Sequence, residues 1–369
     1  MKPTQFSHLI GNSLIKKCLT KLIDKEATSH SLLFTGPCGV GKSLFAIALA
    51  AQIMQKEKDG LHHLDKISRG IHPDLHFYYP EGKIALHSIQ SLKKLCEEAY
   101  LPPYEAKHKF LVLHEAHRML SFSANALLKT FEEPPAHTKI ILLTHSPSQL
   151  LPTILSRCST YFFQPIAENE IFHYLQKNFS DQSIEELKKW SKLSQGSLAK
   201  AIEFVKKGEN KLRKILLDAL SENALHSYGS LVQLSLQLSE EIENKKKQIE
   251  EENKNKRKKE SDSFSAAQNE ALAKELEGNL ALESMSEMDH LFFIVLSWYR
   301  DLSLLQTSAS LDLLINSDYK EELIAALQQG QTISLEKVQK AIEEARLALQ
   351  RATTLSICIE NLLLKLTNL

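Results

Sequence analysis

The chain has few cysteines, and none of them stands in a pairing pattern. Its five cysteines, at positions 18, 38, 96, 158 and 358, are far apart, and no two form a Cys-x-x-Cys pair. A disulfide framework and a cysteine-based zinc site are therefore not expected. A reducing compartment fits this cysteine usage.

Long apolar runs and an excess of one charge are also missing. No run of about 18 apolar residues occurs, and the first residues lack the apolar core of a signal peptide, so we expect a cytoplasmic protein without membrane contact. Lys plus Arg and Asp plus Glu number 45 each. With no global positive field, any contact with DNA must be local or be made by partner chains.

The first 165 residues alternate between helix-like and strand-like segments. A helical spacing of apolar residues runs from Ser13 to Glu26. Short apolar runs follow at residues 31–34, 75–79, 110–113, 140–144 and 161–163. Several of these runs lack the alternation of a half-exposed strand, as expected for strands covered on both faces. The pattern predicts an α/β domain with a parallel sheet.

The strand pattern stops after Pro165, and the rest of the chain is expected to be helical. Residues 168–205 read as short helices with a break at Gly196 and Ser197, and a last helix is expected from Leu335 to Leu366. The segment near 240–275 contains a dense run of charges of both signs at 240–260. We interpret that run as a solvated helix or mobile connection rather than as a nucleic-acid patch, because the glutamates nearly cancel the lysines and arginines.

A phosphate-binding loop lies between the first strand and the next helix. The pattern Gly-x-x-x-x-Gly-Lys-Ser lets backbone N–H groups point at phosphate oxygens, while the lysine reaches the β- and γ-phosphates and the serine meets Mg²⁺. The loop either binds nucleotide or is a relic that binds it weakly. Its residues are Gly36, Pro37, Cys38, Gly39, Val40, Gly41, Lys42 and Ser43.

The second acidic site that nucleotide hydrolysis normally requires is altered. The strand at 110–113 ends in His114 and Glu115, where an aspartate and a glutamate would steady Mg²⁺ and orient water. A neutral imidazole is a poor partner for Mg²⁺. Binding of ATP with Mg²⁺ therefore stays an open possibility, and we expect hydrolysis by the chain itself to be weak or absent. A zinc site at His114 and His117 lacks a third nearby ligand and is not favoured.

Together these motifs resemble the clamp-loader subunits of bacterial DNA polymerase III, a family of AAA+ proteins. The similarity rests on the phosphate-binding loop, the block from His114 to Lys129, and Ser156-Arg157-Cys158, and it is nearest to the delta-prime branch. Ser297 to Leu302 resembles the family's helical collar. The resemblance implies an AAA+ P-loop domain at 1–165, a helical lid at 166–208 and a collar at 209–369.

The resemblance also implies function and partners. It implies a subunit that joins delta and gamma/tau subunits in a heteropentamer and helps to load the sliding clamp onto primed DNA. Arg157 would act as an arginine finger toward a neighbouring ATP site, Glu115 would be a vestigial catalytic residue, and Thr144 would join the nucleotide site. The alternative is a gamma/tau-like motor ATPase. A P-loop enzyme acting on a small molecule is a third possibility, but no acceptor site is evident.

Two departures from the family pattern concern metal binding and the lid. Relatives carry four zinc-binding cysteines in the region that corresponds to residues 52–74, where this chain has none. His62, His63, His72 and His76 cluster there instead, and because four-histidine sites are rare we expect no zinc. In the lid, Lys200 lies near the position of a sensing arginine and lacks its bidentate fork.

Overall fold

The structure is a computed structural model that describes residues 6–24, 30–57, 59–222, 227–260, 266–330, 333–351 and 353–366. It contains two compact units. The first comprises Met1–Lys206 and Ala266–Asn279, and the second comprises Lys207–Ser265 and Leu280–Leu369. The three-domain division expected from the sequence stays a prediction. None of the helices in the described ranges has both the length and the apolar content needed to cross a membrane.

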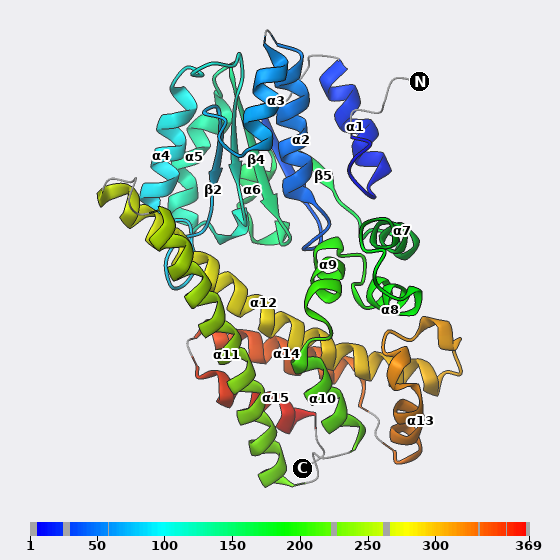
Figure 1. Ribbon diagram of the computed structural model, residues 1–369. Helices are drawn as coiled ribbons and strands as arrows, with labels where there is room; N and C mark the ends of the chain where they lie inside the picture. The colour runs from blue at the N-terminus through cyan, green and yellow to red at the C-terminus, as the bar shows by residue number, and fades with distance from the viewer. Residues whose placement is uncertain are drawn as a thin grey trace. The chain divides into compact units, whose positions relative to one another are not determined.

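A five-stranded parallel sheet forms the centre of the first unit (Figure 1). The strand order is β2-β3-β4-β1-β5, so the first strand of the chain pairs with the last two. Residues Ser31 to Thr35 of β1 lie opposite Ile140 to Thr144 of β4. The strands are β1 (Ser31–Thr35), β2 (Leu75–Tyr78), β3 (Lys109–Leu113), β4 (Thr138–Thr144) and β5 (Ser159–Phe162).

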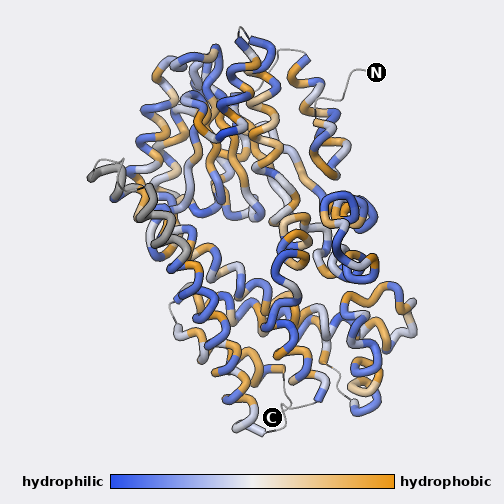
Figure 2. Tube along the Cα trace, in the orientation of Figure 1, coloured by the Kyte–Doolittle hydropathy of each residue, from blue (hydrophilic) through white to orange (hydrophobic). Residues whose placement is uncertain are grey.

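Helices cover both faces of this sheet, which explains the continuous apolar runs of its central strands. Figure 2 shows the central strands of the sheet as mostly apolar. On one face α1 (Ser13–Asp24), α2 (Lys42–Gln55) and α3 (Gly60–Ser68) contribute to one core. On the other face α4 (Ile89–Tyr100), α5 (Ser121–Glu132) and the short α6 (Pro152–Leu155) contribute to a second core. The predicted α/β class with a parallel sheet is therefore confirmed.

Three short helices complete the first unit after the sheet. They are α7 (Glu168–Asn178), α8 (Ile184–Leu193) and α9 (Leu198–Lys207). The helical conformation is interrupted between α8 and α9 at Gly196, whose φ is 82°. A Cβ there would lie 2.4 Å from Pro165 Cβ, so only glycine fits this close approach. The predicted break at Gly196 and Ser197 is confirmed.

The second unit is helical, as predicted. Its helices are α10 (Lys211–Ser221), α11 (Tyr228–Glu260), most of α12 (Ala266–Gln306), α13 (Lys320–Gln328), α14 (Leu335–Gln350) and α15 (Leu355–Lys365). The charged run at 240–260 is part of α11, and residues 261–265 of the charged segment lie outside the described residues. The prediction of one helix from Leu335 to Leu366 is wrong. α14 ends at Gln350 and α15 begins at Leu355, and this break lets Ile359, Leu362 and Leu363 of α15 pack into the core shared with α14.

The residues that resemble a collar motif have a structural role in this unit. Trp298 is fully buried in the helical core. The buried carboxylate of Asp301 accepts hydrogen bonds from the backbone N–H groups of Ile315 (3.1 Å) and Asn316 (2.7 Å). This carboxylate therefore ties α12 to the turn that precedes α13, which places the two helices in one packed body.

Candidate functional site

Glycines shape the phosphate-binding loop between β1 and α2. The φ angles of Gly36, Gly39 and Gly41 are 143°, 76° and 92°, which are values that residues with side chains rarely adopt. At Gly36 a Cβ would lie 2.3 Å from the carbonyl oxygen of Phe163. The loop then leads directly into α2, whose first residue is Lys42, so the positive end of the helix dipole faces the loop.

Lys42 lies inside this loop. Its Nζ donates hydrogen bonds to the carbonyl oxygens of Gly36 (2.7 Å) and Pro37 (2.6 Å). Burial lowers the pKa of Lys42, and the charges of Cys38 and Glu115 oppose that shift. A phosphate group held by the loop would therefore meet the ammonium group of Lys42, as the P-loop motif requires.

The serine at the start of α2 faces a histidine where the motif would place an aspartate. Ser43 Oγ lies 3.3 Å from His114 Nε2, and the His114 ring stacks on Tyr79 with 4.3 Å between ring centroids. Burial lowers the pKa of His114 to about 4, so the ring is neutral near pH 7. A neutral nitrogen donor suits Mg²⁺ poorly. The loop thus fits phosphate, but its partner residue does not fit Mg²⁺.

Glu115 is engaged by a histidine that the sequence analysis missed. His145 Nδ1 lies 3.0 Å from Glu115 Oε2, and His117 Nδ1 lies 3.6 Å from the same oxygen. The neighbouring Cys38 and Glu115 raise the pKa of His145 to about 10, so this imidazole is protonated near pH 7. An ion-paired Glu115 is a weak acceptor for a proton from attacking water. The only sequence clue was that His145 directly follows β4.

Thr144 belongs to the same cluster. Its hydroxyl oxygen, at the end of β4, accepts a hydrogen bond from Ser146 N–H at 3.0 Å and lies 3.1 Å from His117 Nδ1. The structure thus brings Lys42, Ser43, His114, Glu115 and Thr144 to the carboxyl ends of β1, β3 and β4. This edge is where ligands bind in open parallel sheets. The ligand-type atoms of Glu115, His117 and His145 lie within 4.8 Å of one another, and His114 is not part of that group.

The start of α9 closes on the phosphate-binding loop. Ala199 N–H donates a hydrogen bond to the carbonyl oxygen of Gly39 at 3.3 Å. A Cβ built on Gly39 would lie 2.0 Å from Ser197 Oγ. The phosphate-binding loop and the start of α9 are therefore in direct contact.

We call Lys42, Ser43, His114, Glu115 and Thr144 the P-loop cluster. Arg157 lies on the surface, away from this cluster. It follows α6, and its Nη2 lies 2.5 Å from Glu132 Oε1. Its Nη1 donates to the carbonyl oxygen of Thr153 at 2.9 Å and lies 3.4 Å from Ser156 Oγ. These contacts hold the guanidinium against its own turn and fix the Ser-Arg-Cys segment.

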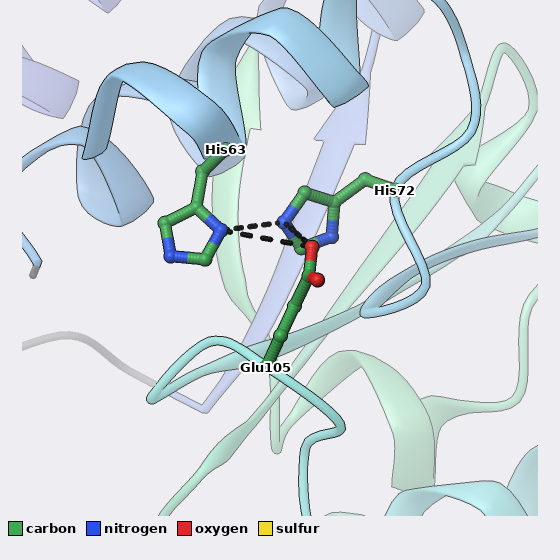
Figure 3. Close-up of side chains that lie close together, drawn as sticks. All are labelled: His63, His72 and Glu105. Carbon is green, nitrogen blue, oxygen red and sulfur yellow. Dashed lines mark hydrogen bonds and ion pairs between the residues drawn. The ribbon is translucent and has the colours of Figure 1, made fainter. Parts of the chain in front are cut away.

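A second group of side chains comes from α3, from the turn before β2 and from the loop between α4 and β3 (Figure 3). His63 and His72 are buried, and the atoms His63 Nδ1 and His72 Nε2 lie 2.9 Å apart. Glu105, which the sequence analysis did not connect with them, reaches the same point. The other two histidines of this region lie apart from this group: His62 is exposed, and His76 Nε2 lies 3.5 Å from Glu98 Oε1.

Comparison with known proteins finds relatives for the sheet-bearing part of the chain. Residues 11–167 match a family model described as DNA polymerase III, delta subunit. The resemblance to DNA polymerase III subunits is confirmed. A Bacillus subtilis protein, DNA polymerase III subunit delta', is 36% identical over 163 residues, which are 42% of this chain and 49% of that protein. The gamma/tau subunit of Mycoplasma pneumoniae is 30% identical over 203 residues, which are 53% of this chain and 30% of that protein.

These similarities cover part of each protein. The chain spans about half the length of the delta' relative and less than a third of the gamma/tau relative. A gamma subunit-related protein from Thermotoga maritima covers 94% of this chain with 16% identity and a TM-score of 0.40. That score is too low to establish a common fold, so the fold rests on the strand order itself.

Proposed function

We propose that the chain is a delta-prime-like subunit of the DNA polymerase III clamp loader. Similarity to a delta' subunit and to a gamma/tau subunit over the sheet-bearing region supports this assignment. The separate helical unit that follows supplies a surface for assembly with other subunits, and we assign it the collar role. The partners are delta and gamma/tau subunits in a heteropentamer, which acts on the sliding clamp and primed DNA.

The contacts of His114 and Glu115 in the P-loop cluster are the observation that supports a delta-prime-like role over that of a motor ATPase. Ser43 faces His114 instead of a carboxylate, and Glu115 is paired with His145. Both changes weaken hydrolysis: the first removes the negative charge that steadies Mg²⁺, and the second occupies the group that would orient water. We therefore assign ATP with Mg²⁺ at most a binding role at this loop.

We assign Arg157 the role of an arginine finger toward the ATP of a neighbouring subunit. Its position after α6 leaves a third of its side chain exposed in the single chain. Reaching a neighbour's phosphates requires the guanidinium to leave Glu132. Exposed ion pairs contribute only about 0–1 kcal/mol, so that exchange costs little. A finger that acts in this way would raise the neighbour's rate by roughly 10³–10⁵.

A motor ATPase like gamma/tau is the second candidate function. The intact glycines, Lys42 and Ser43, together with the similarity to a gamma/tau subunit, favour it. The His114 and Glu115 contacts count against it. Turnover of ATP by the isolated chain distinguishes the two functions, because a delta-prime-like subunit alone should show none above background.

Assembly with the other subunits tests the proposal directly. The chain is mixed with delta, gamma/tau and the sliding clamp from one organism, and complex formation is followed by size-exclusion chromatography with light scattering. We expect one complex that contains the chain, and loading of the clamp onto primed DNA that is lost when the chain is omitted. A chain that elutes alone in every mixture would overturn the assignment.

A further inference from the structure

Three separate segments of the first unit meet at one buried point (Figure 3). His63 comes from α3, His72 from the turn that precedes β2, and Glu105 from the loop between α4 and β3. Both histidines are at most 5% exposed. Two imidazole nitrogens and one carboxylate oxygen point toward one another, and none of these atoms belongs to the P-loop cluster.

The distances between the three donor atoms lie within about 0.5 Å of the edge length of a zinc tetrahedron. His63 Nδ1 lies 2.9 Å from His72 Nε2, and Glu105 Oε1 lies 3.4 Å from His72 Nε2 and 3.9 Å from His63 Nδ1. Zinc bonds of about 2.0–2.1 Å at tetrahedral angles put ligand atoms roughly 3.3–3.4 Å apart. The three observed distances bracket that value, so small side-chain movements suffice to hold an ion.

The carboxylate of this group is held in place from outside. Asp74 is fully buried, and its two oxygens accept hydrogen bonds from the backbone N–H groups of Tyr104, Glu105 and Ala106 at 2.5, 2.9 and 2.8 Å. Asp74 stands two residues after His72, so it fixes the loop of Glu105 beside that histidine. Lys66 Nζ binds the outer oxygen, Glu105 Oε2, at 2.5 Å. The inner oxygen, Oε1, is buried and has no hydrogen-bond partner.

A proton now occupies the place between the two histidines. Asp74 N–H donates to His72 Nδ1 at 3.1 Å, so the proton of neutral His72 sits on Nε2 and points to His63 Nδ1. A metal ion bound by Nε2 replaces this proton and moves the ring proton to Nδ1, which costs the hydrogen bond from Asp74. That bond is a single neutral one, whereas the ion gains three ligands. The ring proton stays on His72, so the ion binds without net release of a proton.

We propose that His63, His72 and Glu105 form a zinc site, with water as the fourth ligand. Two neutral imidazoles and one carboxylate form a ligand set that suits zinc better than Mg²⁺ or Ca²⁺. Lys66 and Asp74 act as outer partners that orient Glu105. The expectation of no zinc rested on the absent cysteines and on a site of four histidines. Glu105, more than thirty residues beyond His72, supplies a carboxylate ligand that was not considered there.

Zinc binding by the full-length chain tests this site. Metal-free protein is titrated with Zn²⁺ in competition with a chromophoric chelator, and Co²⁺ is used as a spectroscopic probe of geometry. We expect one tight site per chain and the intense visible absorption of tetrahedral Co²⁺. His63→Gln and Glu105→Gln should each weaken Zn²⁺ binding by about 100-fold or more, beyond the 10–100-fold typical of outer partners.

Two matched variants make the result specific. His62→Gln changes the exposed neighbour on the same helix and should bind Zn²⁺ like the unaltered chain. His145→Gln removes a donor from the other group of possible ligands and should also bind normally. Absence of tight Zn²⁺ binding by the unaltered chain, or loss in His145→Gln with retention in His63→Gln, would overturn the proposal. Circular dichroism confirms that each variant is folded before its affinity is compared.

Discussion

Ser43 Oγ and His114 Nε2 lie 3.3 Å apart, at the place where a P-loop protein would hold Mg²⁺ between a hydroxyl and a carboxylate. The hydroxyl is present and the negative charge is not. This one contact accounts for the combination of an intact phosphate-binding loop with a weakened metal position. It also identifies the single substitution that should reverse the weakness.

His114→Asp should strengthen the binding of ATP in the presence of Mg²⁺. The new carboxylate would face Ser43 and supply the charged oxygen that Mg²⁺ prefers. We expect about a tenfold gain in affinity, equivalent to roughly 1.4 kcal/mol, measured with a fluorescent ATP analogue. The gain should disappear when EDTA removes Mg²⁺. His8→Asp, which changes an exposed histidine, should have no effect, and equal affinities for the two variants would refute the explanation.

Arg157→Ala and Glu132→Ala should separate a finger from a structural ion pair. Either variant breaks the same surface contact, so each should change the free energy of unfolding by less than about 1 kcal/mol. In the assembled complex only Arg157→Ala should reduce ATP hydrolysis at the neighbouring subunit, because Glu132→Ala leaves the guanidinium free to reach it. Steady-state ATPase of complexes reconstituted with each variant is the measurement. Equal rates for the two would leave Arg157 with the structural role alone.

Gly39→Ala should destabilise the chain more than Gly82→Ala. The two glycines have φ angles of 76° and 70°, so an added Cβ strains the backbone at both, at a cost of about 1–2 kcal/mol. At Gly39 the Cβ would also lie 2.0 Å from Ser197 Oγ, whereas at Gly82 it would meet nothing within 4 Å. Urea unfolding of the first unit should reveal the difference. Adding Ser197→Ala to Gly39→Ala should recover part of it, and no recovery would argue against the collision.

Acid should destabilise the first unit between about pH 6.5 and pH 4. Burial lowers the pKa values of His87, His114 and His117 to about 4. In this range the unfolded chain binds protons that the folded chain does not, so the free energy of unfolding falls as pH falls. Each histidine contributes at most about 3.5 kcal/mol, from about 1.4 kcal/mol for each pKa unit. Denaturant unfolding at several pH values measures the slope.

Replacing His87 by Phe tests the origin of that slope. A phenyl ring fills the same buried place and cannot bind a proton, so the variant should lose the part of the acid sensitivity that belongs to His87. It also loses the hydrogen bond between His87 Nε2 and the carbonyl oxygen of His114, which lowers the stability at every pH. A pH slope equal to that of the unaltered chain would show that His87 does not titrate as described.

The sheet could be predicted because its information is local. The ends of each of the five predicted apolar runs agree within two residues with the ends of a strand. The runs are clearest in β1, β3 and β4, because strands buried on both faces need a continuous run of apolar side chains. The Ser43–His114 relation was also predictable, because the motif specifies which strand end faces the loop. The break between α14 and α15 was not, since apolar residues continue at helical spacing on both sides of the turn.

Contacts between distant segments could not be predicted. Glu132 lies 25 residues before Arg157, and nothing in the local pattern of either residue indicates that they pair. His145 and Glu105 escaped for the same reason: each completes a cluster whose other members are on different elements. Such contacts depend on how helices and loops pack over the sheet, and a single sequence contains no periodic signal for that packing.

The place of β1 inside the sheet has a consequence for synthesis of the chain on the ribosome. Ser31 pairs with Ile140, which is made 109 residues later, and Leu32 pairs with Ser159 of β5, which is made later still. At about 5–20 residues per second, the apolar strand Ser31–Thr35 waits roughly 5–20 s without either neighbour. The nascent chain therefore exposes an unpaired, aggregation-prone segment during this interval, and a chaperone that shields it should raise the yield of folded protein.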